Sequence, residues 1–287
     1  MTITQILEPI LKLFVIIFLS AQPLWAQPRI VALSPAINEI IFALGAGEQV
    51  VANTLYSKYP PESQNRYKVG GYFQPNLERI LAIQPTMVIL HPLDPILITR
   101  LKAVGIETLS VHMRTLDDII QAIELIGQAT DKTKTATRLV QKLTTKMVTT
   151  QQSVTPKALK ILVVFGMTLS FNQGVYVAGQ ALYFNDIIQL VGCHNAFDNS
   201  AIEQPILTRE GILATQADIV IILAHDRLER GLSSQVIKQP WQQLALPAAR
   251  QHNIYVIDAS YATIPSHRVI HLIDDFKAIV QKAQQAS

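Results

Sequence analysis

Two histidines follow strongly apolar stretches of the chain. His91 comes directly after residues 86–90, and His225 follows residues 219–223 and one alanine. An imidazole in such a place can coordinate zinc, haem iron or an axial site of cobalt. Asp226, the next residue, could orient the His225 ring as a hydrogen-bond acceptor, or could simply be solvated. A bare metal ion normally takes three or four protein ligands, and the remaining histidines show no spacing that would supply them. Axial contacts to a chelated metal and ordinary loop structure both stay open.

Aromatic and hydroxyl side chains also follow the predicted strands. In parallel α/β sheets, ligands bind beyond the carboxyl ends of the strands, so the residues found there are candidates for a binding cleft. Aromatic rings offer a large apolar area with a polar tip, which suits a bulky, flat and partly polar ligand. The alternative is that a tyrosine beside prolines merely packs a loop. The cleft candidates are Ser34, Pro35, Tyr56, Tyr72, Phe73 and His91 in the first half, and Phe171, His225 and Tyr261 in the second.

Two glutamates occupy the same place in two similar segments. Residues 76–84 and 208–216 share Glu, Ile, Leu, Ala and Gln at one common offset, and Glu78 corresponds to Glu210. Each follows a capping residue, where a carboxylate favours the positive end of a helix by about 0.3–1 kcal/mol. A glutamate repeated on two lobes is also what docking onto a two-fold symmetric partner requires. Both interpretations can hold together.

A second internal match lies upstream of the first. Residues 38–41, Asn-Glu-Ile-Ile, resemble residues 185–188, Asn-Asp-Ile-Ile, and each segment is followed by an apolar residue and a glycine. The two matches occur in the same order along the chain. They therefore predict two lobes built on related plans.

Short β-branched runs alternate with helical patterns along most of the chain. Near-continuous apolar runs separated by helices indicate strands that are buried on both faces, and hence mainly parallel sheets. The predicted class is α/β. The expected strands lie at 29–33, 49–52, 86–90, 106–109, 161–165, 219–223 and 254–257.

A long helix is predicted between the two halves, over residues 131–154. Its apolar residues recur every three or four positions, which fits one helical stripe from Ala136 to Val148. Thr130 or Asp131 can cap its start, and Pro156 ends it. At 1.5 Å per residue the rod would be roughly 36 Å long. With no glycine in this segment, we expect lobes 27–129 and 156–287, joined by a backbone helix at 130–155, to open and close little.

The first 26 residues have the order of a secretory signal. Lys12 precedes the apolar run 13–19, and a polar stretch then leads to Ala26. The apolar core is far shorter than the roughly 20 residues that span a membrane, which disfavours an uncleaved anchor. We expect cleavage near Ala26 and export to a bacterial periplasm. No cysteine follows the run, so a lipid anchor is not expected.

The composition excludes several classes of protein. Apolar residues make up 49% and charged residues 16% of the 287 positions, which excludes a disordered, collagen-like or coiled-coil chain. The net charge of +3 is spread without a basic block, so nucleic acid is not expected as a partner. The single cysteine, Cys193, excludes a disulfide framework and every multi-cysteine metal site.

The glycines and serines do not form a known catalytic motif. The turn after the first predicted strand is Ser34-Pro35-Ala36, without the glycines of a dinucleotide fingerprint. Residues 45–47, Gly-Ala-Gly, follow a helical pattern and are better explained as its C-cap and turn. An exported α/β hydrolase would have to use Ser34, His225 and Asp226. Ser34 lies in no nucleophile elbow, however, and adjacent His and Asp residues cannot easily form a relay.

Several stretches carry a resemblance to a known family. They are 29–35 with Asn38 and Glu39, 59–61, 69–71 and 76–80 in the first half, and 165–166, 185–192 and 208–210 in the second. In this order they resemble the periplasmic binding proteins of ABC importers for cobalamin and ferric siderophores. The likeness covers nearly all of residues 29–283. It implies two α/β lobes that face each other across a cleft and are bridged by a long helix, in a receptor with no catalytic activity and no resident cofactor.

The resemblance also implies the ligand and the partner. A metal chelate is expected, first cobalamin or another corrinoid, then a ferric siderophore, then haem. A monomeric receptor would deliver it to an inner-membrane permease dimer driven by a cytoplasmic ATPase. In this family one glutamate per lobe docks on arginine pockets of the permease, and the matching positions are Glu78 and Glu210. Tyr56, Tyr72, Phe171 and Tyr261 match positions where the family's cobalamin binder places aromatic rings.

Some positions depart from the cobalamin binder. Lys58 replaces an acidic residue, Ile264 replaces an arginine in a late cleft loop, and Gln204 replaces a tryptophan. Cys193 matches one half of a disulfide whose other half is missing, so a buried free thiol is expected. These differences keep the receptor class but leave the chelate open. A zinc or manganese receptor of similar architecture is the alternative.

Overall fold

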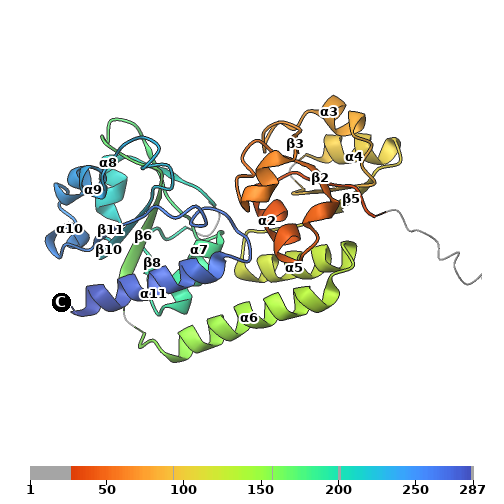
Figure 1. Cartoon of the computed structure of the whole chain (residues 1–287). Coiled ribbons are helices and arrows are strands. Elements are labelled where there is room, and N and C mark those ends of the chain that lie inside the picture. Colours follow the sequence, from red (N-terminus) through yellow and green to blue (C-terminus); the bar gives the residue numbers. More distant parts are fainter. Residues whose placement is uncertain (1–26, 93, 157, 200–201, 286–287) are drawn as a thin grey trace, which may run out of the picture.

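The computed structural model describes residues 27–92, 94–156, 158–199 and 202–285. They form two α/β lobes, each around its own sheet, with helix α6 (Thr133–Gln152) running along both (Figure 1). The expected α/β class, with mainly parallel sheets and a long connecting helix, is confirmed. The predicted signal peptide, residues 1–26, lies outside the described residues.

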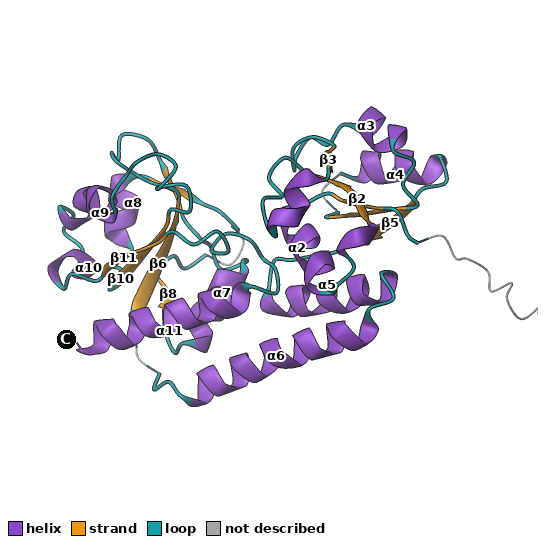
Figure 2. Cartoon of the chain, in the orientation of Figure 1, coloured by secondary structure: helices purple, strands orange, loops and turns teal. Residues whose placement is uncertain are grey.

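The first lobe contains a five-stranded sheet in the order β3-β2-β1-β4-β5, and every pairing in it is parallel. Its strands lie among the helices of that lobe (Figure 2). The central strands are buried because helices cover both faces, whereas the edge strand β5 exposes both of its end residues. The strands are β1 (Ile30–Ala32), β2 (Val50–Asn53), β3 (Tyr67–Lys68), β4 (Met87–Leu90) and β5 (Glu107–Ser110). The helices are α2 (Pro35–Ala43), α3 (Leu77–Ala82), α4 (Pro95–Ala103) and α5 (Leu116–Ala129), with 3-10 turns η1 (Gly47–Gln49) and η2 (Pro61–Asn65).

The second lobe contains a parallel four-stranded sheet in the order β11-β10-β6-β8, and an antiparallel pair, β7-β9. The short strands β7, β8 and β9 have only two residues each, too few for an apolar pattern to reveal them. The strands are β6 (Lys160–Phe165), β7 (Val175–Tyr176), β8 (His194–Asn195), β9 (Ile206–Leu207), β10 (Ile219–Leu223) and β11 (Ile254–Ile257). The helices are α7 (Tyr183–Leu190), α8 (Arg209–Ala214), α9 (Ser234–Gln242), α10 (Pro247–Arg250) and α11 (Val269–Gln285).

Helix α6 is shorter than its sequence pattern predicted. Its 20 residues span about 30 Å. The predicted caps are wrong, because Thr130 donates its hydroxyl to a carbonyl at the end of α5 and Asp131 takes a positive φ in the turn between the helices. Val148, the last residue of the predicted apolar stripe, is 52% exposed. The buried face of α6 shifts along its length because it packs first on α5 and then on α7 and α11, so that Thr150 is buried instead.

The lobes share more than a connecting helix. The largest apolar cluster includes buried residues of α2 and α5 in the first lobe, of α6, and of α7 and α11 in the second lobe. Its continuity means that changing the angle between the lobes would disturb close-packed side chains. The two sheets nevertheless stay separate.

The internal match around Glu78 and Glu210 corresponds to equivalent structure. In each lobe a six-residue helix, α3 or α8, precedes an interior strand of the sheet, β4 or β10. Gln84 and Gln216 follow these helices at the repeated offset, and they adopt φ values of 47° and 46°. The recurrence of this uncommon left-handed conformation at both sites supports a shared plan for the two lobes.

Candidate functional site

Loops that follow the strands of the first sheet contact the second lobe. Lys58, after β2, pairs with Glu229, which lies in the loop after β10, at 3.1 Å. Arg114, after β5, pairs with Glu203, which precedes β9, at 2.8 Å. The carboxyl ends of the strands of the first sheet therefore face the second lobe. Ligands of α/β proteins usually bind at these ends of the strands.

A small cavity lies where the strand order of the first sheet reverses, between β1 and β4. This switch point is the characteristic ligand position in an open parallel sheet. The cavity has a volume of about 130 Å³, and Leu33, Tyr72, Phe73, Pro75, Leu90, His91, Asp94 and Leu97 line it. Three of the predicted cleft residues, Tyr72, Phe73 and His91, are thus brought together.

The rings of this cavity pack on one another. The Tyr72 and Phe73 ring centroids are 4.6 Å apart, and those of Tyr72 and His91 are 5.5 Å apart, both edge to face. Phe73 remains 81% exposed, so a large apolar surface faces outward beside the cavity. Burial, and then the carboxylate of Glu203 in the second lobe, raise the pKa of Tyr72, which therefore stays a neutral phenol.

His91 is held as a neutral imidazole. Its Nδ1 atom lies 3.0 Å from the carbonyl oxygen of Val111, and because a carbonyl can only accept, Nδ1 carries the proton. Burial lowers the pKa of His91, with a further lowering by His112 and an opposing effect of the Val111 hydrogen bond. The Nε2 lone pair is then free of a proton at neutral pH. A pinned Nδ1–H with a bare Nε2 is the usual arrangement of a metal-ligating histidine.

A glycine turn positions Tyr72 and Phe73. Gly70 has a φ of 114°, and a Cβ there would lie 2.9 Å from the carbonyl oxygen of Gln74. The carbonyl of Gly70 accepts a hydrogen bond from the backbone of Leu55 at 3.0 Å, which ties this turn to the loop 54–60. Only glycine fits this backbone without strain. The conformation of the turn therefore explains why the segment 69–71 has a glycine at position 70.

Tyr56 projects from the neighbouring loop 54–60. It is 63% exposed. Its ring lies close to Gly71, because a Cβ added to that glycine would be 3.8 Å from the ring, in van der Waals contact. Exposed leucines also mark the loops that follow the strands: Leu55 in the first lobe, and Leu169 and Leu228 in the second. The rim of the candidate site is therefore apolar as well as aromatic.

In the described part of the chain, the predicted cleft residues of the second lobe do not line one cavity as three of those in the first lobe do. Phe171 packs edge-on against Trp241, with ring centroids 5.0 Å apart, and is partly buried by that cluster. His225 is exposed. Asp226 forms an ion pair with Arg230 at 2.7 Å, so the suggestion that it orients His225 is not supported by a contact. β10 extends one residue further than β4 in the repeat, so His91 and His225 are not structural equivalents.

Ser34 is occupied as a helix cap. Its side chain is 1% exposed and accepts a hydrogen bond from the backbone N–H of Ile37 at 3.1 Å, while Pro35 occupies the first turn of α2. The expectation that the Ser34 side chain faces a ligand is therefore corrected. Buried and engaged as a cap, Ser34 is also not placed as the exposed nucleophile of a hydrolase.

Glu78 and Glu210 lie exposed in the first turns of α3 and α8. The caps are as expected: Asn76 accepts from the backbone of Arg79 at 2.9 Å, and Thr208 accepts from that of Gly211 at 3.2 Å. Hydrogen bonds to its own backbone N–H and to Thr208 lower the pKa of Glu210. Both interpretations of the pair, helix chemistry and docking, are compatible with these positions.

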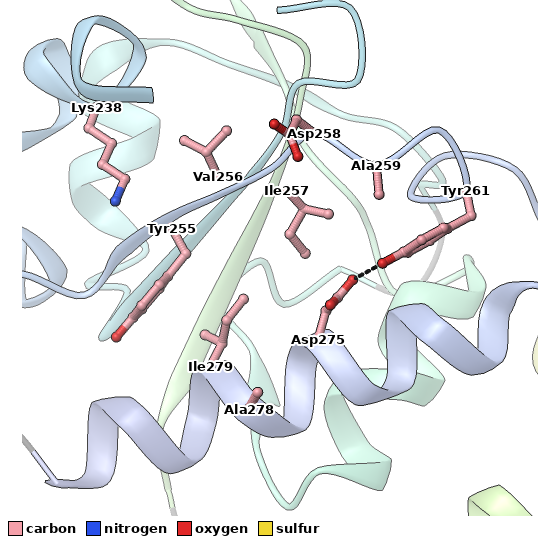
Figure 3. Close-up of a pocket in the computed structure, with 10 residues that line it drawn as sticks. All are labelled: Lys238, Tyr255, Val256, Ile257, Asp258, Ala259, Tyr261, Asp275, Ala278 and Ile279. Atoms are coloured by element: carbon pink, nitrogen blue, oxygen red, sulfur yellow. Dashed lines mark hydrogen bonds between the residues drawn. The ribbon is translucent and has the colours of Figure 1, made fainter. Parts of the chain in front are cut away.

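A larger hollow of about 330 Å³ lies along the edge strand β11, between α9 and α11 (Figure 3). Tyr261 closes one end, where its hydroxyl donates to Asp275 at 2.8 Å. At the other end lies Tyr255, with Lys238 and Lys282 each about 6 Å from its ring centroid. This hollow runs along a sheet edge and reaches the carboxyl end of only one strand, β11. The cavity at the β1/β4 switch point is therefore the better candidate for ligand capture.

The departures from the cobalamin binder have local explanations. Lys58 is paired with Glu229, Gln204 is exposed, and Ile264 packs against the large apolar cluster. Cys193 is a free, buried cysteine, as expected, and burial followed by the charge of Asp218 raises its pKa to about 11.

Within the described parts of the chain, no group of three or more His, Cys, Asp and Glu side chains is placed to hold a metal ion. In the same residues, no helix is both long and apolar enough to cross a membrane. The described residues therefore give no support to the alternative of a bare zinc or manganese site.

Comparison with known proteins places this geometry in a family. A family model described as periplasmic binding protein matches residues 30–261. The chain belongs to the periplasmic binding protein family. Members of this family are substrate-binding receptors of ABC transporters rather than enzymes, and they deliver small-molecule chelates to membrane permeases.

Individual relatives of this periplasmic binding protein share most of its length. A vitamin B12-binding protein of Pectobacterium carotovorum is 28% identical over 226 residues, which are 76% of this chain and 78% of the relative. The crystal structure of the periplasmic vitamin B12-binding protein of Vibrio cholerae matches with a TM-score of 0.75 at 22% identity, over 90% of this chain and 98% of the other. The periplasmic haem-binding protein RhuT of Roseiflexus, in its apo form, matches with a TM-score of 0.75 at 25% identity, over 91% and 100%.

Proposed function

We propose that this protein captures a metal chelate in the periplasm and delivers it to the permease of an ABC importer. Cobalamin or another corrinoid is the first choice of ligand, followed by a ferric siderophore and then haem. The likeness to vitamin B12-binding relatives supports this order, and the likeness to a haem-binding protein keeps haem in the set. The chain itself carries out no catalysis, because its role is capture and presentation.

The observation that carries this proposal is the aromatic cavity at the switch point of the first sheet. Tyr72, Phe73 and His91 line it, and exposed Tyr56 stands in the adjoining loop. A cavity of about 130 Å³ is too small to enclose a whole chelate, so it would hold one edge or one axial substituent. The remainder of the ligand would lie against the exposed rings and against Phe171 and Tyr261 of the second lobe.

His91 is assigned the contact to the chelated metal. Its neutral ring, with Nδ1 bound to the Val111 carbonyl and Nε2 free, suits an axial position on cobalt or iron. His225 is assigned to the rim because it is exposed and because the neighbouring Asp226 pairs with Arg230. A single imidazole does not hold a bare ion but can complete the coordination of a metal that a macrocycle already holds.

Export and docking complete the proposal. The segment 1–26 directs secretion and is removed near Ala26. The receptor then acts as a monomer, with Glu78 and Glu210 each meeting a cationic site on one half of a permease dimer whose cytoplasmic ATPase drives import. Like carboxylates at equivalent places on two lobes match the symmetry of such a partner.

The ligand class is tested by titrating the purified mature protein calorimetrically with cyanocobalamin, a ferric hydroxamate and haemin. We expect saturable binding of a corrinoid, or else of one of the other two chelates. The visible absorption spectrum of protein isolated from its native host provides an independent assignment, because the three chelates absorb differently. Binding of none of them, together with a colourless native protein, would reject the proposed function.

The metal contact is tested with a cobalamin whose axial position holds exchangeable water, and with haemin. His91→Ala should abolish the spectral change that imidazole coordination causes, and should weaken binding about tenfold, equivalent to about 1.4 kcal/mol. His225→Ala is the matched control and should leave both properties within about threefold of the unmodified protein. A spectral change that survives in His91→Ala would refute the assigned coordination while leaving the receptor function intact.

A further inference from the structure

Helix α2 carries two buried polar side chains next to each other. Asn38 is fully buried and Glu39 is 3% exposed. Both belong to a segment that recurs in the second half of the sequence and that the proposed ligand contacts do not use. A carboxylate and an amide inside a protein are costly unless each is partnered, so their partners indicate what they do.

Asn38 holds the backbone of a cleft loop. Its side-chain N–H donates to the carbonyl of Tyr59 at 2.9 Å, and its carbonyl oxygen accepts from the side chain of Asn53 at 2.9 Å. Asn53 in turn accepts from the ammonium of Lys68 at 2.7 Å. This chain of hydrogen bonds fixes the loop 54–60, which carries Tyr56.

Glu39 reaches across to the second lobe. Its carboxylate accepts from two nitrogens of the Arg268 guanidinium, with Nε at 2.9 Å, and from the hydroxyl of Ser266 at 2.5 Å. Ser266 and Arg268 belong to the loop 258–268, between β11 and α11. The ion pair is buried, because Arg268 is only 8% exposed. We call Glu39, Ser266 and Arg268 the interlobe clamp.

Arg268 holds both cleft loops with one planar group. The carbon of its guanidinium lies 3.9 Å from the centroid of the Tyr59 ring, in the loop of the first lobe. Its Nη1 atom donates to the hydroxyl of Ser260 at 3.1 Å, in the loop that also carries Tyr261. Paired N–H donors and a stacking face are properties of arginine that lysine lacks.

We propose that Glu39 and Arg268 are positioning residues for ligand capture. By joining the loop of Tyr56 to the loop of Tyr261, the interlobe clamp sets the separation of the two aromatic walls before the ligand arrives. The restriction on lobe movement then comes from this buried contact beside the cleft as well as from α6. Preorganisation of this kind improves affinity because less ordering remains to be done on binding. The consequence for affinity rests on the proposed function, whereas the effect on lobe separation does not.

Positioning can be separated from stability at this site. Replacing a buried ion pair by uncharged residues of similar shape is often neutral for stability, whereas removing one partner leaves a buried charge and is strongly destabilising. The double variant Glu39→Gln/Arg268→Met removes both charges and the stacking. It should fold, with a urea midpoint close to that of the unmodified protein.

Lobe separation is measured on ligand-free protein by electron spin resonance distances. Spin labels are attached at Val104→Cys and Val236→Cys, exposed sites on the first and second lobes, in a Cys193→Ser background. The unmodified clamp should give one narrow distance distribution, and the double variant a broad one. Cyanocobalamin affinity, measured on the same variants without labels, should fall at least tenfold.

The matched control removes an ion pair between the lobes that is exposed instead of buried. Lys58→Ala/Glu229→Ala deletes an exposed pair that joins the same lobes, and should leave the distance distribution of the ligand-free protein unchanged. Arg268→Lys keeps the charge but loses the paired donors and the stacking, and should broaden the distribution and weaken binding to an intermediate extent. This variant also supplies the test if the double variant does not fold.

The outcomes are distinguishable. A narrow distribution and full affinity in the double variant, or in Arg268→Lys should the double variant not fold, would overturn the positioning role and leave the pair as ordinary packing. Absence of cyanocobalamin binding in the unmodified protein would instead count against the proposed ligand, and the distance measurement would still decide whether the clamp sets the lobe separation.

Discussion

His267 combines burial with a position beside the interlobe clamp. Its Nδ1 atom is buried without a hydrogen-bond partner among the described residues. Burial, followed by the charge of Arg268 and smaller effects of His271 and Lys142, lowers the pKa of His267 to about 4. The ring is therefore neutral at physiological pH and adds no competing charge to Arg268. The burial of His267 lowers the stability of the fold only at acidic pH.

The pH dependence of stability follows from this shift. An unfolded histidine titrates near pH 6.5. Below that pH the unfolded state therefore binds a proton at this residue, whereas the folded state stays unprotonated until the pH approaches 4. Stability contributed by the neutral ring is complete above pH 6.5 and is lost as the pH falls towards 4. Urea unfolding of the unmodified protein should show a loss of about 2 kcal/mol between pH 7 and pH 5 from this residue.

His267→Gln should remove that part of the pH dependence, while His112→Gln, at an exposed position, should retain it. An unchanged slope in His267→Gln would show that this imidazole is not the source of the acid sensitivity.

Cys193 offers a second test at the residue scale. Burial raises the pKa of its thiol to about 11, so almost no reactive thiolate exists in the folded protein. Ellman's reagent should fail to react with native protein at pH 8 and should react with one thiol after unfolding in urea. Rapid labelling of the native protein would contradict the buried position.

At the scale of elements, short turns hold the candidate site more than long helices do. The turn 70–75 carries Tyr72 and Phe73, and its first residue, Gly70, adopts a φ of 114° against the carbonyl of Gln74. β1 and β4 supply the floor of the cavity, because parallel strands end at the same edge of the sheet. A change in this turn should therefore move the aromatic wall without dissolving the sheet.

Gly70→Ala should destabilise the protein by about 1–3 kcal/mol, the usual cost of a strained backbone position, and should weaken ligand binding as well. Gly105→Ala is the matched control, because Gly105 also has a positive φ, of 78°, but a Cβ there meets no atom within 4 Å and the residue lies before β5, at the opposite edge of the sheet. Calorimetric titration should find normal affinity in Gly105→Ala. Equal loss of affinity in both variants would mean that the turn has no special part in binding.

At the scale of the molecule, two related lobes carry a glutamate at the same place. Glu78 and Glu210 stand in equivalent short helices. The shared apolar core and the Glu39–Arg268 contact join the two lobes, so we expect the distance between these helices to vary little. A fixed distance matters for docking, because two carboxylates that meet two cationic sites at once bind more tightly than either does alone. In the proposed docking, the two lobes would therefore also set the spacing of the two carboxylates.

Glu78→Ala/Glu210→Ala should bind the chelate normally yet fail to support its uptake into cells that lack the native copy. Each single variant should show a smaller defect. Glu107→Ala/Glu124→Ala removes the same number of exposed carboxylates from outside the repeat and should transport normally. Normal uptake by the first double variant would eliminate these glutamates as the docking contacts.

The sequence alone indicated the fold class, the main strands, the connecting helix and the related halves, because buried parallel strands and capped helices leave local, periodic patterns. It also placed Tyr72, Phe73 and His91 among nine candidates for the cleft, without separating them from the other six. It could not show that Ser34 is consumed as a helix cap, nor that the 227 to 229 residues separating Glu39 from Ser266 and Arg268 would close into one contact. Such contacts leave no periodic signal. They depend on how the two lobes pack together, and only the tertiary structure decides that.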